Sequence, residues 1–120
     1  MLSSRTHRTI SPQEAAAAHS QGELVIVDVR ESAERAIEHV AGSLHIPLAQ
    51  VPGRLPELPR DTAVAFVCRS GRRSAAAAAT AAKGGVDAAN VRGDLLAWRE
   101  TQLPLVTGSQ RSHPKPKDAA

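Results

Sequence analysis

One seven-residue segment near the middle of the chain holds the residue types most able to do covalent chemistry. It reads Cys68-Arg69-Ser70-Gly71-Arg72-Arg73-Ser74. Cys68 is the single cysteine of the sequence, so it forms no internal disulfide and makes no structural zinc site by itself. Ser70 and Gly71 permit a tight loop whose backbone N–H groups turn towards an anion, and the arginines add positive charge. These neighbours favour the thiolate, and they predict a reactive Cys68 with a pKa below the free value of about 8.5.

The flanking elements are expected to place this segment at the edge of a sheet. The apolar run at residues 63–67 is typical of a strand covered on both faces, and a helix is expected from Ser74 through Ala82. Ligands of an open parallel sheet collect at the carboxyl ends of its strands. The start of the following helix adds unpaired N–H donors and the positive end of its dipole. The same cradle would hold an anionic substrate.

Strands and helices alternate along the rest of the chain. Ser11, Pro12 and Glu14 open a first helix with a capping box, and this helix ends at Gln21-Gly22. The remaining expected elements are a buried strand at 24–29, a short helix at 32–37 before a turn at 39–42, a short strand at 44–47, a helical turn or loop between Pro52 and Pro59, a strand at 88–91 and a last helix at 94–100 that carries Trp98 as a core anchor. This alternation predicts an α/β domain with a central, mostly parallel sheet flanked by helices.

The domain is expected to span residues 10–107. Residues 1–9 form a lead-in with an edge strand at its end, and residues 108–120, which are polar with two prolines, are expected to be a disordered basic tail. A length of 120 residues suits one domain, and we expect a monomer.

Composition excludes several classes of function. Aromatic residues make up 2% of the chain, which rules out the stacking surfaces of many RNA- and single-stranded-DNA-binding proteins. The net charge of +3 comes from local clusters rather than a basic stripe, so no nucleic-acid partner is expected. No apolar run approaches the roughly 20 residues of a membrane span, and the first residues do not read as a signal peptide, so we expect a cytoplasmic protein without a membrane partner. The histidines lack metal-ligand spacing, and neither a metal nor a cofactor is expected.

The chemistry expected of Cys68 is either transfer of a soft atom to sulfur or attack on a phosphoryl group, because a pre-formed thiolate needs no general base. A cysteine phosphatase uses Cys-x5-Arg, whereas Cys68 and Arg73 are spaced as Cys-x4-Arg and the next residue is Ser74. The loop is therefore one residue short for a phosphatase, which is disfavoured. A structurally inert cysteine beside a solvated basic loop is also disfavoured, because strand, cysteine, loop, arginines and helix follow in unbroken order.

Residues 24–107 resemble a rhodanese domain of the single-domain sulfurtransferase type. The matching segments are Asp28-Val29-Arg30-Glu31, His39-Val40-Ala41-Gly42-Ser43 before Ile46-Pro47, the Cys68–Ser74 loop, and Arg92-Gly93-Asp94-Leu95-Leu96-Ala97-Trp98. The resemblance implies a rhodanese-like three-layer fold. It also implies that Cys68 takes a sulfane sulfur from thiosulfate or a persulfide donor, forms a cysteine persulfide, and passes the sulfur to a thiol or cyanide acceptor.

The resemblance assigns roles to the loop residues. Backbone N–H groups of the loop would stabilise the persulfide, and Arg69, Arg72 and Arg73 would attract the small anionic donor; Arg73 is alternatively a brace that points inward. Ser70 and Gly71 complete this substrate-binding loop. Ser70 is expected to be a loop donor and Ser74 a helix cap that supports the loop, rather than nucleophiles. Asp28 and Arg30, at the end of a buried strand, need partners and are expected to support the loops near the site.

A second reading from another class stays open beside the enzyme. In it the chain is a carrier or non-catalytic rhodanese module that delivers sulfur to a protein partner or binds one. A small-anion reductase or a phosphatase is a distant third. The chain departs from the usual rhodanese pattern at Arg35, Glu38, Ala41 and Asp94, and these departures bear on efficiency and substrate rather than on Cys68 or loop length.

Overall fold

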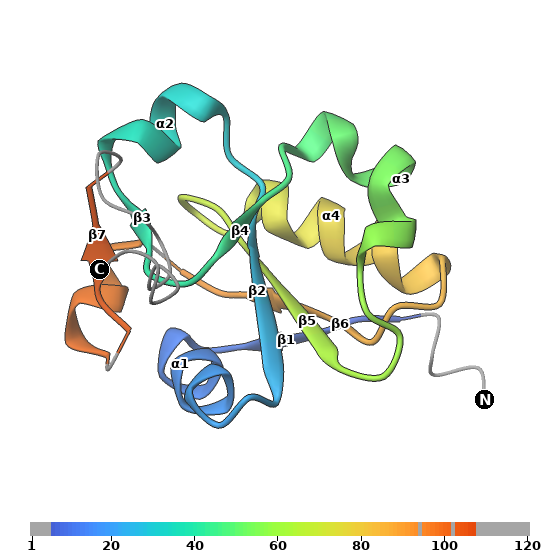
Figure 1. Ribbon diagram of the computed structural model, residues 1–120, viewed down its shortest axis with the longest axis horizontal. Helices are drawn as coiled ribbons and strands as arrows, with labels where there is room; N and C mark the ends of the chain where they lie inside the picture. The colour runs from blue at the N-terminus through green and yellow to red at the C-terminus, as the bar shows by residue number, and fades with distance from the viewer. Residues whose placement is uncertain (1–5, 94, 102, 108–120) are drawn as a thin grey trace, which may run out of the picture.

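A five-stranded sheet forms the centre of the molecule (Figure 1). The computed structural model describes residues 6–93, 95–101 and 103–107. The strand order is β1 (Arg8–Ile10), β6 (Ala88–Val91), β5 (Ala63–Val67), β2 (Leu24–Asp28) and β4 (Leu44–His45). Every neighbouring pair in this sheet is parallel. The α/β class predicted from the sequence is therefore confirmed, with β1 as the edge strand. The expected tail and the role considered for Asp94 lie outside the described residues.

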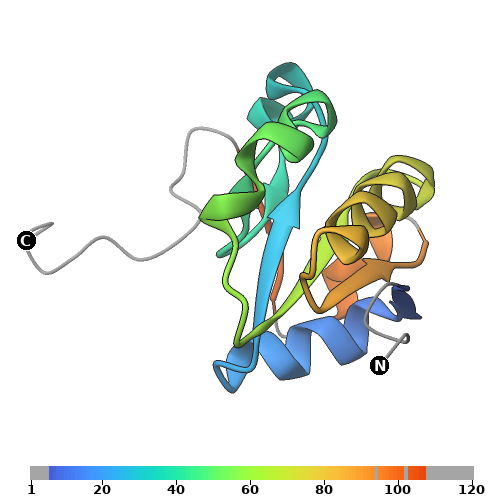
Figure 2. The ribbon, with the colours of Figure 1, turned by 90° about the vertical axis from the view of Figure 1, so that its right-hand side faces the viewer.

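Helices cover both faces of the sheet. The α-helices are α1 (Pro12–Ser20), α2 (Ser32–Ile37), α3 (Val51–Arg54) and α4 (Arg72–Lys83), and the 3-10 helices are η2 (Leu48–Gln50), η3 (Leu55–Glu57) and η4 (Leu95–Glu100). One apolar cluster joins α3 and α4 to one face, and a second joins α1 and η4 to the other. Figure 2 shows α1 and α4 on different sides of the strands. No helix of the described residues is long and apolar enough to cross a membrane.

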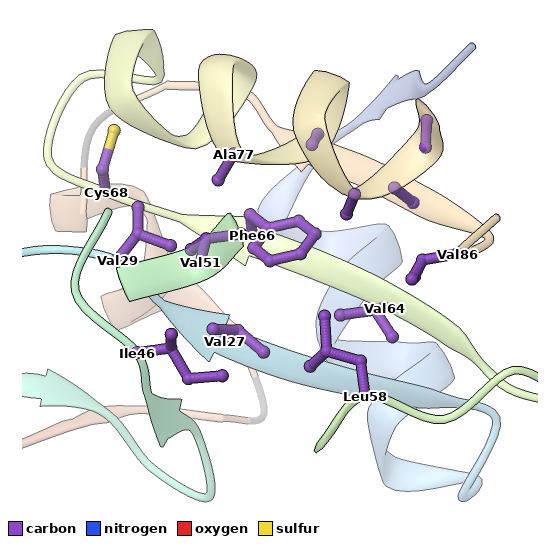
Figure 3. Close-up of a cluster of buried hydrophobic side chains, with 14 residues drawn as sticks. Val27, Val29, Ile46, Val51, Leu58, Val64, Phe66, Cys68, Ala77 and Val86 are labelled. Carbon is purple, nitrogen blue, oxygen red and sulfur yellow. The ribbon is translucent and has the colours of Figure 1, made fainter. Parts of the chain in front are cut away.

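Strand β5 shows why the sheet needs both layers. Val64 and Phe66 belong to the cluster under α4, while Ala65 and Val67 belong to the cluster on the α1 side, and all four are buried. This alternation follows from the two-residue period of a strand. Cys68 closes the row at one end of the α4-side cluster, beyond Phe66 (Figure 3). The buried strand predicted at residues 63–67 is thus confirmed, and Trp98 is buried in the opposite cluster, as expected of a core anchor.

A small second sheet differs from the sequence-based expectation. The predicted turn at residues 39–42 begins instead as β3 (His39–Val40), which pairs antiparallel with β7 (Leu105–Val106). Two-residue strands carry no alternation that a sequence reveals, and the partner strand lies far along the chain. The pairing fixes the end of α2 against the last described segment of the chain.

The other element boundaries follow the predicted ones closely. The Ser11 side chain and the Glu14 side chain exchange hydrogen bonds with each other's backbone, so the capping box of α1 is confirmed. Helix α4 begins at Arg72 rather than at Ser74 as predicted, because Gly71 occupies the N-cap position. The last helix, carrying Trp98, is 3-10 in form.

Asp28 binds two arginines at the carboxyl end of β2. Its carboxylate accepts hydrogen bonds from the Arg30 side chain at 3.0 and 3.1 Å and from Arg35 at 3.3 Å. The side chains of Asp28 and Arg30 are only 1% and 5% exposed, so these charges have lost most of their hydration. Arg30 also donates to the Glu38 carbonyl and Arg35 to Ser43. The carboxylate therefore anchors both ends of the α2 region to the sheet.

Replacing the Asp28 carboxylate is expected to lower the free energy of unfolding. Asp28→Asn leaves two buried or half-buried guanidinium groups without their counter-charge, and we expect a loss of about 3–5 kcal/mol in the free energy of unfolding. Urea denaturation would measure it, with Glu57→Gln as the control, since Glu57 pairs with Arg54 on the surface and little change is expected there. Equal effects of the two substitutions would contradict this account.

Candidate active site

The sulfur of Cys68 lies where β5 ends and α4 begins. It accepts hydrogen bonds from the backbone N–H of Gly71 at 3.1 Å and of Ser74 at 3.3 Å. The Ser74 hydroxyl lies 3.3 Å from the same sulfur. Cys68 is only 3% exposed, so the sulfur is largely removed from water. The sequence-predicted loop is thus wrapped around the sulfur, with its donors directed inward.

The conformation of Gly71 is what brings these donors together. Gly71 has φ +98°, a region that residues with a Cβ rarely adopt, and it is the N-cap of α4. Arg72 and Arg73 are then the first two helical residues and Ser74 the third. The N–H at the third position of a helix has no partner within the helix, and here the Cys68 sulfur accepts it. Ser74 therefore acts inside the first turn and not as the cap expected from the sequence.

Hydrogen bonding outweighs burial in setting the acidity of Cys68. Burial raises the pKa of the thiol, but the hydrogen bonds bring the pKa below its ordinary value. In order of effect, these hydrogen bonds are the one with the Ser74 side chain and then those from the backbone N–H groups of Ser74, Gly71 and Ser70. This agrees with the lowered pKa expected from the sequence, and it identifies hydrogen bonds as the main cause rather than the arginines.

Asn90 is a part of the site that the sequence analysis did not single out. The Ser74 hydroxyl donates to Asn90 Oδ1 at 2.5 Å, and both residues are buried. Asn90 pairs in register with Phe66 and so faces α4 from β6. A signal was present in the sequence, because Asn90 is the only polar residue in the strand at 88–91 and a buried amide needs a partner. The partner of Asn90 is Ser74, and the two residues meet because α4 begins at Arg72 and places Ser74 in its first turn.

The three loop arginines have different surroundings. Arg69 and Arg72 are exposed, and within the described part of the chain neither forms an ion pair. Arg73 instead forms a two-point ion pair with Glu34 of α2, at 2.7 and 2.9 Å. This ion pair joins the first turn of α4 to α2 at a partly exposed position. Glu34 was not predicted as a site residue, since nothing in its local sequence indicates a partner on α4.

The remaining predicted residues lie beside the loop and not in contact with the sulfur. Asp28 is level with Val67 in the sheet, next to Cys68, but its carboxylate binds Arg30 and Arg35. Because Arg35 lies on α2, the Asp28–Arg30–Arg35 cluster supports the loop only through the position of that helix. The exposed Ser70 contributes its backbone N–H to the sulfur.

His39 is buried in β3 instead of lying in the predicted turn. Its Nδ1 lies 3.2 Å from the Arg35 carbonyl oxygen, within hydrogen-bonding distance. Burial and then the Arg35 charge lower the pKa of His39. The imidazole is therefore neutral near pH 7, as its burial beside the positively charged Arg35 favours.

The chain is similar to known proteins of one family. A family model for the rhodanese-like domain matches residues 11–101, which is well over half of the chain. The chain belongs to the rhodanese-like family. A sulfurtransferase of Allochromatium vinosum is 36% identical over 85 residues, covering 70% of this chain and 79% of that protein.

Solved structures of rhodanese-like proteins share the fold. The crystal structure of a rhodanese-related protein from Thermoplasma volcanium superposes with a TM-score of 0.74 and 29% identity, covering 83% of this chain and 98% of that chain. A rhodanese with anions from E. coli superposes with a TM-score of 0.61 and 27% identity, covering 71% and 99% of the two chains. The rhodanese-like three-layer fold expected from the sequence is therefore confirmed.

The Glu34–Arg73 ion pair of this rhodanese-like domain is expected to stabilise it in a pH-dependent way. Hydrogen bonding to Arg73 lowers the pKa of Glu34 from 4.5 to about 2, although burial opposes the shift. A lowered folded-state pKa means that the stabilisation is complete above pH 4.5 and is lost as the pH falls towards 2. We expect Glu34→Gln to lower the free energy of unfolding by about 1 kcal/mol at pH 7, since both side chains remain partly exposed.

Urea titrations of the wild type and Glu34→Gln across this pH range would measure the difference. Glu23→Gln, which removes an exposed carboxylate outside the site, is the matched control and should show no such pH dependence. A stability difference that persists unchanged down to pH 2 would contradict the assignment to this ion pair.

Proposed function

We propose that this protein is a sulfurtransferase that carries sulfane sulfur on Cys68 as a persulfide. The observation that carries the proposal is the set of N–H donors from Gly71 and Ser74 around a buried sulfur at the start of α4. No carboxylate or imidazole of the described residues hydrogen-bonds this sulfur, which agrees with a thiolate formed without a general base. Family membership and the sulfurtransferase from Allochromatium vinosum support the same activity.

The reaction is a double displacement. The Cys68 thiolate attacks the outer, sulfane sulfur of thiosulfate; the S–S bond of thiosulfate breaks, and sulfite leaves with its electron pair. A new S–S bond then holds the sulfur on Cys68 as a persulfide anion. An acceptor thiolate or cyanide attacks the outer sulfur of that persulfide, and Cys68 leaves as a thiolate. Cyanide is released as thiocyanate, and the enzyme returns to its starting state without a cofactor.

The surroundings of Cys68 suit both charged states of this cycle. Each half-reaction starts and ends with negative charge on sulfur, so donors that stabilise a thiolate also stabilise a persulfide anion. The start of α4 adds a positive dipole end at the same place. Arg69 and Arg72 extend the positive charge to the surface, where a small anionic donor would arrive.

The proposal is tested by the intact mass of the protein after brief incubation with thiosulfate and no reductant. We expect a gain of one sulfur atom, which cyanide removes as thiocyanate. Cys68→Ser is expected to take up no sulfur while keeping its far-UV circular dichroism spectrum. Uptake by that variant, or no uptake by the wild type from thiosulfate and from a persulfide donor alike, would overturn the proposal.

Turnover separates the enzyme from the carrier considered above. Repeated thiocyanate production from excess thiosulfate and cyanide indicates an enzyme. A stable persulfide formed once per chain, which only a protein partner discharges, indicates a carrier module.

The exposed Arg69 and Arg72 are expected to favour an anionic sulfur donor over a neutral one. Arg72→Gln, or Arg69→Gln, is expected to lower kcat/KM for dianionic thiosulfate by about 3- to 10-fold, because a nearby exposed charge contributes on the order of 1 kcal/mol. A neutral persulfide donor should be affected much less, and added salt should reduce the difference. Arg8→Gln is the matched control. Arg8 pairs with Asp87 at the amino-terminal ends of β1 and β6, whereas Cys68 follows the carboxyl end of β5. Equal losses with both donors would contradict this electrostatic role.

A further inference from the structure

The Ser74 hydroxyl sits between the sulfur and a buried amide. It lies 3.3 Å from Cys68 Sγ and 2.5 Å from Asn90 Oδ1. Cys68, Ser74 and Asn90 are 3%, 0% and 8% exposed. The three groups form one buried row that joins β5, α4 and β6, which we call the Cys68–Ser74–Asn90 row.

Counting protons along this row shows that it must change when Cys68 ionises. In the thiol form, Cys68 donates to Ser74 Oγ, and the hydroxyl donates to Asn90 Oδ1. A thiolate has no proton and only accepts. The hydroxyl has a single proton, so it cannot donate to the thiolate and to Asn90 Oδ1 at once.

An asparagine resolves this conflict in a way that few side chains can. Its amide carries an acceptor and two donors on groups of nearly the same shape. A half-turn of the amide places Nδ2–H against Ser74 Oγ, which then accepts from Asn90 and donates its own proton to the sulfur. The thiolate gains a third donor in addition to the N–H groups of Gly71 and Ser74, and the Ser74 hydroxyl keeps a hydrogen-bond partner on each side.

We propose that Asn90 is a positioning residue whose amide turns over as Cys68 ionises, so that the Ser74 hydroxyl donates to the thiolate and, on the function proposed above, to the persulfide sulfur. Register supports this assignment. Asn90 faces α4 from a strand whose other residues are apolar, and its Oδ1 contacts the Ser74 hydroxyl. Asn90 is therefore an amide on the otherwise apolar, α4-facing side of β6, within hydrogen-bonding distance of the Ser74 hydroxyl.

Other charged groups around the sulfur act from different directions. Arg69 and Arg72 belong to the loop and the first helical turn, and Arg73 has its pKa raised mainly by Glu34 and in small part by the Cys68 charge. None of these groups hydrogen-bonds the Ser74 hydroxyl within the described residues. Their effect on the thiol therefore does not depend on Ser74, and that difference makes a test possible.

The test is the pH dependence of Cys68 alkylation by iodoacetamide, whose rate follows the thiolate fraction. We compare wild type, Asn90→Leu, Ser74→Ala and the double variant. Asn90→Leu keeps the shape of the side chain but removes its hydrogen bonds. It is expected to raise the midpoint by about half a pH unit, because the bond that Asn90 donates to Ser74 Oγ is strengthened by the thiolate charge, so that its loss costs the thiolate form more than the thiol form. Ser74→Ala is expected to raise the midpoint at least as much, and Asn90→Leu should add nothing in the Ser74→Ala background.

Each alternative result overturns the proposal. A midpoint that falls in Asn90→Leu would mean that Asn90 is a fixed acceptor competing with the thiolate for the hydroxyl. An unchanged midpoint would mean that Asn90 does not reach the sulfur through the hydroxyl. A rise of equal size in the Ser74→Ala background would mean that Asn90 acts through general packing. Asn90→Ala replaces Asn90→Leu if the leucine variant does not fold, as judged by circular dichroism.

This measurement is independent of sulfur transfer. Alkylation reports on the thiol with no sulfur donor present, whereas the mass experiment reports on persulfide formation. If Cys68 takes up no sulfur but the midpoints shift as expected, the proposed function fails and the role of Asn90 stands. The reverse pattern leaves the sulfurtransferase in place and removes the role of Asn90.

Discussion

The Cys68 sulfur has to hold a negative charge in a place from which most water is excluded, and the surrounding fold supplies what water would have supplied. Two backbone N–H groups stand in for the lost hydration. These donors belong to a tight loop and to a helix that start directly after a buried strand. The sheet fixes the position of the cysteine, and the helix fixes the positions of its donors. A small displacement of either would leave a buried charge with fewer partners.

Two ion-paired groups extend this support outward from the sulfur. Arg73 leaves the first turn of α4 and binds Glu34 on α2, while Asp28 holds α2 and the chain after β2 through Arg30 and Arg35. One carboxylate therefore joins the first turn of α4 to α2, and the other joins α2 to the sheet. Because the Asp28 cluster is buried and the Glu34 pair is partly exposed, the first contributes mainly to the integrity of the fold and the second to the placement of the loop.

The sequence was most informative where one short segment carried its own signal. The strand before Cys68, the capping box of α1 and the loop with its glycine were all predictable, because hydrophobic runs, caps and turns depend on neighbouring residues. Asn90, Glu34 and the β3–β7 pair were not, since each depends on a partner far along the chain. The start of α4 was misplaced by two residues because Gly71, rather than a side-chain cap, opens that helix. Separation along the sequence, not chemical type, distinguishes the contacts that were predictable from those that were not.

The pairing of β1 with β6 joins the beginning of the described chain to a strand more than three quarters of the way along it. During synthesis from the N-terminus, β1 has no sheet neighbour until residues 88–91 have been made. Asn90 lies on that same late strand, and Ser74 needs α4 complete to reach it. A nascent chain that has just produced Cys68 therefore carries an ordinary thiol, not an acidified one. The reactive sulfur is therefore a property of the finished fold and not of the Cys68–Ser74 segment alone.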